Sequence, residues 1–175
     1  MIWPADNAII SLLEYVKTQA HLPRLADVRI DVSMTDGPAF TKDRINLGRV
    51  AKVPECYRMR QKIPADFCIT ISGGTWGEVF KTELQRQALL DLHLTRIQPV
   101  YTNEVVIENK KKVVVKDEWG RTKHTDIVKL DKNGEPMWTI DPLDLRTITR
   151  NIRRYGLWFE DLLECSSVII DAAGK

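Results

Sequence analysis

The sequence predicts an α+β fold, in which helices pack on a small mixed sheet. Three observations favour this class: apolar residues at helical spacing near the N-terminus, short alternating segments in the first half, and a β-rich stretch over residues 102–140. The chain has 175 residues, of which 43% are hydrophobic, so it can bury a sizeable core. We therefore expect a single domain over residues 1–175.

The first half predicts one helix and three strands. Asp6 or Asn7 can cap a helix that runs to about Gln19. Alternating apolar residues predict strands at residues 26–32 and 67–72, and a third strand is expected at residues 45–53. The next helix should span residues 77–97 and end before Pro99.

The second half predicts an extended β-hairpin region followed by two helices. The valine-rich segments 105–107 and 113–115 flank a polar turn and form a hairpin. Further strands are expected at residues 126–130 and 137–140, separated by a turn at residues 131–134. The two helices cover residues 142–155 and 157–172, with Gly156 as the break.

Composition limits the classes of function. The net charge of +2 does not by itself call for nucleic acid or a membrane surface. The 3 cysteines are scattered and form no paired motif, which favours a reducing cytoplasm over a disulfide framework. There is no run of 18 apolar residues and no secretory signal at the N-terminus, so no membrane association is expected.

The segment Gln85-Arg86-Gln87-Ala88-Leu89-Leu90-Asp91, followed by Leu94, resembles the signature helix of the phage metallopeptidase family, a zincin-like group. The resemblance extends from about His21 to Leu163, through the segments 47–53, 66–76, 134–138 and 154–158. It implies a zincin-like fold. In that family two histidines one helical turn apart hold Zn²⁺, and a glutamate between them acts as general base.

The resemblance places unsuitable residues at these positions. Leu92 and Arg96 stand where the two histidines would be, and His93 stands at the base position. Leu143 occupies the position of a third ligand in a downstream segment. Leucine has no lone pair to donate, and the guanidinium cation of arginine repels a metal ion. We therefore predict a degenerate site that holds no metal or cofactor and performs no catalysis.

His93 leaves an alternative open, because it is the ionisable residue that remains at this site. It could act with Asp91 and with His124 or Asp144 in a metal-dependent hydrolase whose site is rearranged. Asp91 and His93 lie on different faces of a helix, so they cannot easily chelate one ion. We favour a histidine that is simply packed in the helix, and we expect His21 and His124 to be unrelated to it.

Arg146, Arg150, Arg153 and Arg154 predict a basic stripe along the penultimate helix. The stripe could bind phosphates of a nucleic acid or an acidic protein surface, or it could be a solvated face paired with nearby carboxylates. The buried side of this helix is predicted at Leu145, Ile148 and Ile152.

The β-hairpin region carries the other candidate binding residues. Lys110, Lys111 and Lys112 are expected at the tip of the hairpin, and Trp119 at a turn between strands. A projecting hairpin can add a strand to a partner's sheet, and an exposed tryptophan can anchor an interface. A second copy of the chain is one such partner, which makes a dimer an alternative.

These observations lead to one hypothesis about function. We predict a non-catalytic, cytoplasmic protein of phage or prophage origin that binds a host or phage macromolecule. Inhibition of a host defence or DNA-processing protein would be one use of such binding. The alternatives are the rearranged hydrolase around His93 and a nucleic-acid-binding module that uses Arg146, Arg150 and Arg153.

Overall fold

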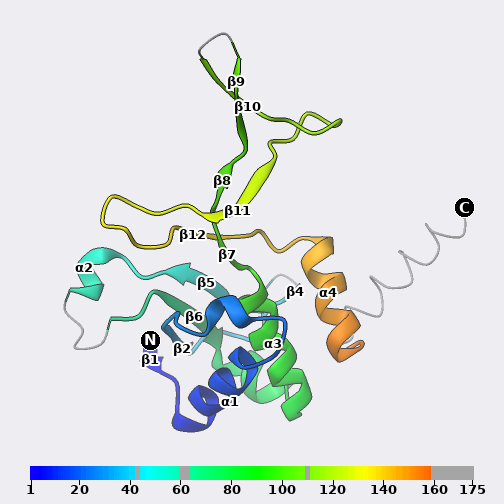
Figure 1. The fold of residues 1–175 in the computed structure, drawn as a ribbon. Coiled ribbons are helices and arrows are strands. Elements are labelled where there is room, and N and C mark those ends of the chain that lie inside the picture. The colour runs from blue at the N-terminus through cyan, green and yellow to red at the C-terminus, as the bar shows by residue number, and fades with distance from the viewer. Residues whose placement is uncertain (42–43, 60–63, 109–110, 159–175) are drawn as a thin grey trace, which may run out of the picture. The chain divides into compact units, whose positions relative to one another are not determined.

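The computed structural model describes residues 1–41, 44–59, 64–108 and 111–158 (Figure 1). The chain forms two compact units. The first comprises residues 1–96 and 142–175, and the second, which we call the ribbon, comprises residues 97–141. The expectation of a single domain stays a prediction, because two compact units can belong to one folding domain.

A mixed sheet of four strands forms the centre of the first unit, in the order β1 (Ile2–Pro4), β2 (Ile30–Thr35), β6 (Phe67–Ser72) and β5 (Arg49–Lys52). The strands β2 and β6 are parallel, and Thr35 is in register with Ser72 at their carboxyl ends. The strands β1 and β5 pair antiparallel with β2 and β6, respectively. The predicted α+β class with a small mixed sheet is therefore confirmed.

Alternation of apolar residues explains the two central strands. Ile30 and Val32 are buried on β2, and Phe67, Ile69 and Ile71 are at most 1% exposed on β6. The first helix, α1 (Asn7–Lys17), buries Ile9, Leu13 and Val16 at helical spacing. Its predicted cap is confirmed, because Asp6 Oδ1 accepts a hydrogen bond from the amide of Ile9 at 2.9 Å. A 3-10 turn η1 (Pro23–Leu25) and a short helix α2 (Glu55–Arg58) connect the strands.

The strand predicted at residues 45–53 is interrupted. The chain instead forms a small hairpin of β3 (Phe40–Thr41) and β4 (Arg44–Ile45), and then β5. Gly48 separates β4 from β5. Its backbone φ is 80°, a conformation that residues with a side chain rarely adopt. A Cβ atom at Gly48 would lie 2.3 Å from the Thr70 carbonyl oxygen, so only glycine allows this close approach to β6.

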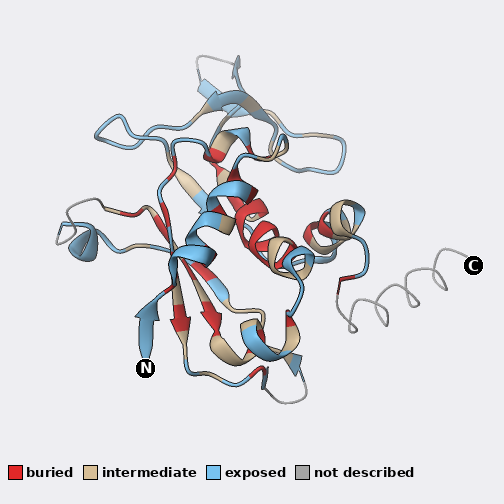
Figure 2. Ribbon diagram, turned by 90° about the horizontal axis from the view of Figure 1, so that it is seen from below, coloured by how far each residue is buried: buried red, intermediate tan, exposed pale blue. Residues whose placement is uncertain are grey.

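The signature helix α3 (Glu83–Thr95) begins later than predicted. Thr82 and Gln85 form a reciprocal capping box, in which Thr82 Oγ1 accepts from the Gln85 amide at 3.2 Å. The segment η2 (Thr75–Val79) before it is a separate π-helical turn. The residues of α3 from Ala88 to Thr95 are all buried, and Figure 2 shows this burial in red. The helix is therefore the centre of the core of the first unit.

The helix α4 (Leu145–Tyr155) follows the ribbon and ends, as predicted, at Gly156, which has a φ of 72°. Its buried residues are Thr147 and Asn151, whereas Leu145 is 63% exposed. The prediction that Leu145 marks the buried side is wrong, because polar contacts with α3 orient this helix. The last predicted helix, at residues 157–172, lies almost entirely outside the described residues.

The ribbon consists of nested antiparallel pairs. From its base outward these are β7 (Ile97–Pro99) with β12 (Trp138–Ile140), β8 (Tyr101–Asn103) with β11 (His124–Val128), and β9 (Val105–Glu108) with β10 (Lys111–Val114). The predicted hairpin is confirmed, with Val106 opposite Val113. The predicted turn at residues 131–134 is confirmed too, since Asp131 Oδ1 accepts from the amide of Asn133 at 2.7 Å.

Candidate functional site

The four positions that the resemblance marks as catalytic serve other purposes in the structure. Leu92 is 2% exposed and belongs to the core of the first unit. Arg96 is the C-cap of α3, and its backbone amide donates to the His93 carbonyl oxygen at 3.2 Å. Leu143 is 42% exposed and precedes α4. Neither leucine offers a ligand atom to a metal; Leu92 packs in the core, and Arg96 ends the helix.

His93 is a buried neutral histidine. It is 2% exposed, and its Nε2 lies 2.8 Å from the Leu47 carbonyl oxygen, to which it donates. Its Nδ1 is also buried and has no hydrogen-bond partner among the described residues. Burial lowers the pKa of His93 to about 4, although the hydrogen bond to Leu47 opposes this shift. The bond links α3 to the segment before β5.

Asp91 is the centre of a polar cluster that sequence reasoning missed. Its carboxylate is 0% exposed and accepts hydrogen bonds from three parts of the chain. His21 Nε2 bonds to Oδ1, whereas Asn151 Nδ2 at 2.8 Å and Arg154 Nε at 3.1 Å bond to Oδ2. Thr95 Oγ1, one turn further along α3, donates to the same oxygen at 3.4 Å. We call these five residues the Asp91 cluster.

The Asp91 cluster attaches α4 to α3. Asn151 also donates to the Ala88 carbonyl oxygen at 3.0 Å and accepts from Trp158 Nε1 at 2.6 Å. The Trp158 ring packs against Phe80, with ring centroids 5.2 Å apart. Beside the cluster, burial and then the negative charge of Asp91 raise the pKa of Tyr155 to about 12. The cluster therefore uses its charges for structure, as buried charges must be paired and hydrogen-bonded.

The described residues do not fit a zinc ion. A zinc site requires at least three nitrogen, sulfur or oxygen ligands around one point. No group of three or more His, Cys, Asp or Glu side chains suited to a metal occurs in the described part of the chain. Asp91 is committed to its cluster, and Asp144 caps α4 by accepting from the Thr147 amide at 2.8 Å. In the first unit, the rearranged hydrolase would therefore have to use His93 Nδ1, which has no hydrogen-bond partner among the described residues, and Asp144, whose cap bonds from Thr147 both go to Oδ1.

A comparison with protein families agrees with the resemblance. The model of the family described as Putative phage metallopeptidase matches residues 7–167. The chain belongs to this family. Comparison with curated proteins and with solved structures finds no match. The family match covers both compact units, so the ribbon is part of the matched region and not an addition to it.

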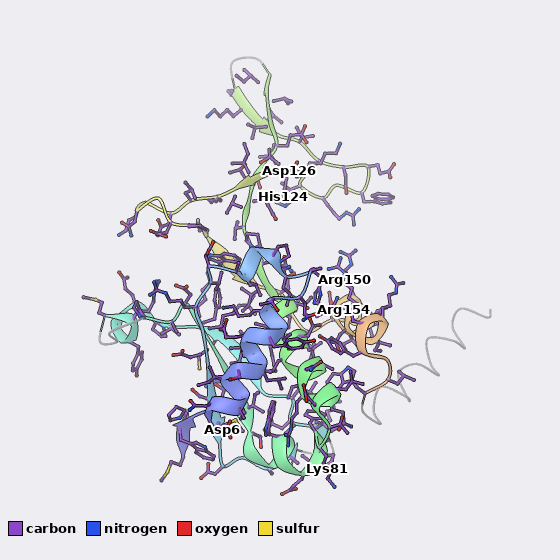
Figure 3. The ribbon with its side chains drawn as sticks, turned by 60° about the horizontal axis from the view of Figure 1, so that its bottom comes forward. Asp6, Lys81, His124, Asp126, Arg150 and Arg154 are labelled. Carbon is purple, nitrogen blue, oxygen red and sulfur yellow. The ribbon has the colours of Figure 1, made fainter. Side chains whose placement is uncertain are left out.

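In this phage metallopeptidase-family chain the predicted arginine stripe is reduced to three members. Arg154 turns toward the Asp91 cluster, and its Nη2 donates to Thr95 Oγ1 at 3.0 Å. Arg146, Arg150 and Arg153 are exposed, and no ion pair of these three occurs among the described residues. Figure 3 labels Arg150 and Arg154 on adjacent turns of α4. Arg146, Arg150 and Arg153 are thus distinct from Arg154, which attaches α4 to α3.

The ribbon presents the remaining predicted residues to solvent. Trp119 is 71% exposed, and Lys111 and Lys112 lie exposed on β10. Lys110 is outside the described residues. The Arg121 guanidinium lies 4.9 Å from the centre of the Trp119 ring. Asp117 Oδ1 accepts from the amides of Trp119 at 3.0 Å and Arg121 at 2.8 Å, so the turn holds this aromatic side chain in a defined place.

Between residues 100 and 141 no described residue is buried. The large apolar side chains there are exposed, among them Val105, Val106, Ile107, Val113, Val114 and Ile127. Figure 2 accordingly shows this part of the ribbon in pale blue and tan. Within the described part of the chain no helix combines the length and hydropathy that a membrane span needs.

Proposed function

We propose that this member of the phage metallopeptidase family is a non-catalytic binding protein of phage or prophage origin. The observation that carries the proposal is the use of the signature helix. Leu92 and His93 fill the core, Arg96 ends the helix, and among the described residues the His93 ring makes one hydrogen bond, to a backbone carbonyl. A helix whose residues are used in this way stabilises the fold, and its described side chains offer no set of ligands for a catalytic metal ion.

The ribbon is the proposed partner-binding part, and a host or phage protein is the proposed partner. Soluble proteins rarely leave so many apolar side chains exposed on consecutive strands without a binding role. In the antiparallel pair of β9 and β10, every second residue directs its backbone groups outward. Because the Val115 amide donates to the Glu104 carbonyl oxygen at 2.9 Å, the outward positions are Val105 and Ile107 on β9 and Lys112 and Val114 on β10. A partner strand could add at either edge.

Trp119 supports the same proposal. Exposed tryptophan and arginine side chains that are already held in place lose little conformational entropy on binding, which is why they often dominate interfaces. The Asp117 turn and the stacked Arg121 supply this preorganisation. Inhibition of a host defence or DNA-processing protein is the use that we propose for such an interface.

The arginine stripe favours a second candidate function, binding of a nucleic acid. Arg146, Arg150 and Arg153 stand at one-turn spacing on α4, which contains no acidic residue. Such a row can contact successive phosphates, and its binding would weaken steeply with salt. Reversing the charge of Arg150 and Arg153 would then abolish binding to a duplex and leave the fold intact. Unchanged binding by that double variant, measured by fluorescence anisotropy at two salt concentrations, would exclude the stripe.

The test of the main proposal combines activity and partner capture. Purified protein should cleave neither a casein substrate nor a peptide library, with or without added zinc. Immobilised wild-type protein should retain a partner from host or infected-cell lysate, and the Trp119→Ala and Val114→Pro variants should lose it. Val114→Thr is the matched control for strand addition, since it keeps the outward amide of this position and a β-branched side chain and should retain the partner. Zinc-dependent cleavage by wild-type protein would contradict the proposal of a non-catalytic protein.

A further inference from the structure

A second candidate binding site lies in the first unit, away from the residues on which the proposed function rests. It is a hollow of about 540 Å³ beside the N-terminal strand β1. Its lining includes Trp3, Asp36, Phe40, Gly73, Gly74 and Glu78. This volume falls within the roughly 300–1,000 Å³ that is usual for small-molecule sites. None of its lining residues belongs to α3, α4 or the ribbon.

The hollow arises where the two parallel strands end. Thr35 and Ser72 are paired at the carboxyl ends of β2 and β6, and the segments that leave these ends form its walls. Ligands in α/β proteins commonly bind just outside this edge of parallel strands. The position therefore favours a binding site independently of which side chains line it.

Hydrogen bonds from side-chain hydroxyls to backbone carbonyl oxygens, together with one close backbone approach, hold the walls of the hollow together. Ser72 Oγ donates to the Pro38 carbonyl oxygen at 3.0 Å, and Thr75 Oγ1 donates to the Asn46 carbonyl oxygen at 2.8 Å. A Cβ atom at Gly74 would lie 2.7 Å from the Ala39 amide nitrogen, so a larger residue would push the walls apart. These contacts keep the walls of the hollow in place, so the hollow forms without a ligand.

Among the described residues, the lining combines aromatic rings with carboxylates and contains no lysine or arginine. Trp3 is 40% exposed and Phe40 is 54% exposed, so ring surface is accessible. Asp36 bonds to the amino group of Met1, whereas Glu78 has no ion pair among the described residues. The hollow therefore offers π surface and one unneutralised carboxylate to a ligand.

Two other tryptophans provide an internal comparison. Trp76 has the Arg86 guanidinium 5.1 Å from its ring centre, and Trp119 has that of Arg121 at 4.9 Å. In the described part of the chain no such cation lies over Trp3 or Phe40. Among the described residues, the rings that line the hollow therefore have no guanidinium or ammonium group over their faces, unlike Trp76 and Trp119.

We propose that this hollow binds an organic ammonium cation. Trp3 and Phe40 would contact the alkyl groups and attract the charge through their π faces, and Glu78 would supply the counter-charge. The cation is either a free small molecule such as a choline compound or a methylated lysine side chain of a protein. Both sources present the same chemistry, and the test separates them.

The experiment is a titration of the full chain with choline, followed by the amide resonances of Gly73 and Gly74 and the indole resonance of Trp3. The comparison ligand is 3,3-dimethylbutan-1-ol, which has the shape of choline without its charge. Choline should bind at least ~10-fold more tightly than this alcohol, because the cation–π and ionic contacts need the charge. A trimethyl-lysine peptide that binds more tightly than choline would identify a protein as the source of the cation.

Variants make the result decisive. Glu78→Gln should weaken choline binding by ~5-fold or more, and Trp3→Leu should do the same. The matched control is Glu118→Gln, which removes an equal charge from an exposed position on the ribbon. Glu78 is exposed and makes no ion pair with a described residue, so Glu78→Gln keeps the test valid even if Trp3→Leu disturbs β1. Equal binding of the neutral alcohol, equal effects of Glu78→Gln and Glu118→Gln, or no saturable shift at Gly73 and Gly74 would each overturn the proposal.

Discussion

The core around α3 and the ribbon place their candidate functional residues in opposite environments. In the first unit, Asp91 and His93 are buried and each is bonded to another segment of the chain. In the ribbon, Trp119 and Lys111 lie exposed on a part of the chain that buries none of its described residues beyond position 99. The histidine and the carboxylate of the family signature thus contribute to structure here, whereas the exposed aromatic and apolar residues are the basis of the binding role that we propose for the ribbon.

The largest difference should appear when a carboxylate is removed from each region. Asp91→Ala leaves Arg154 and Asn151 without their acceptor inside the first unit, so it should reduce the free energy of unfolding by about 3–5 kcal/mol. Asp126→Ala, on the exposed face of the ribbon, should change it by less than about 0.5 kcal/mol. Urea denaturation followed by tryptophan fluorescence measures both. Equal losses would remove the distinction between the two regions.

The second prediction concerns the pH dependence of the first unit. The pKa of His93 is lowered to about 4 in the folded chain, from an ordinary value of 6.5. The unfolded chain therefore binds a proton first as the pH falls, and stability is lost between about pH 6.5 and 4, by ~3 kcal/mol. Above pH 6.5 the His93 ring is neutral in both the folded and the unfolded chain, so His93 does not make stability depend on pH there.

The control for this titration is His93→Gln, which can still donate to the Leu47 carbonyl oxygen but does not titrate. Denaturation curves of the two proteins across this pH range should converge toward low pH, because only the wild type loses the histidine contribution. Parallel dependence of stability on pH in the two proteins would contradict the prediction, because it would mean that the pKa of His93 is the same in the folded and unfolded chains.

A smaller effect is expected at the start of α3. Thr82→Ala removes the side-chain acceptor for the Gln85 amide, and loss of such a cap costs about 1 kcal/mol. Thr82→Ser keeps the hydroxyl and should be close to wild type. A loss as large as that of Asp91→Ala would mean that the cap positions the whole signature helix.

The smallest effect on stability is expected at the exposed tryptophan. Trp119→Ala should change the free energy of unfolding by no more than about 0.5 kcal/mol, because its ring contacts Arg121 and no core. Differential scanning calorimetry gives the comparison, with Trp158→Ala as the buried counterpart. A destabilisation by Trp119→Ala similar to that of Trp158→Ala would assign this ring to packing and remove it from the proposed interface.

Local patterns in the sequence predicted much of the fold. The strand β6, the cap at Asp6, the hairpin of β9 and β10 and the turn ending at Gly134 all follow from residues that are neighbours along the chain. The capping box of Thr82 and Gln85 has an equally local signal, and the start predicted at residue 77 overlooked it.

The Asp91 cluster could not be predicted in this way. Asp91 meets His21 across 70 residues and Asn151 across 60, and no spacing rule joins them. The contacts of Asn151 with α3 turn this side of α4 inward, and Leu145 is left exposed despite its hydrophobicity. The hollow beside β1 was missed for a similar reason, since Trp3, Phe40 and Glu78 come together only when the parallel strands pair.

The most direct test of the central claim is zinc content after equilibrium dialysis, measured by mass spectrometry for wild type, His93→Gln and the triple variant Leu92→His, His93→Glu and Arg96→His. Wild type should retain no more zinc than His93→Gln, because the residues of its signature helix are used for packing. The triple variant, which supplies two histidine ligands one turn apart, should retain more than either. Stoichiometric zinc in wild type that His93→Gln abolishes would contradict the account and restore this helix as a metal site.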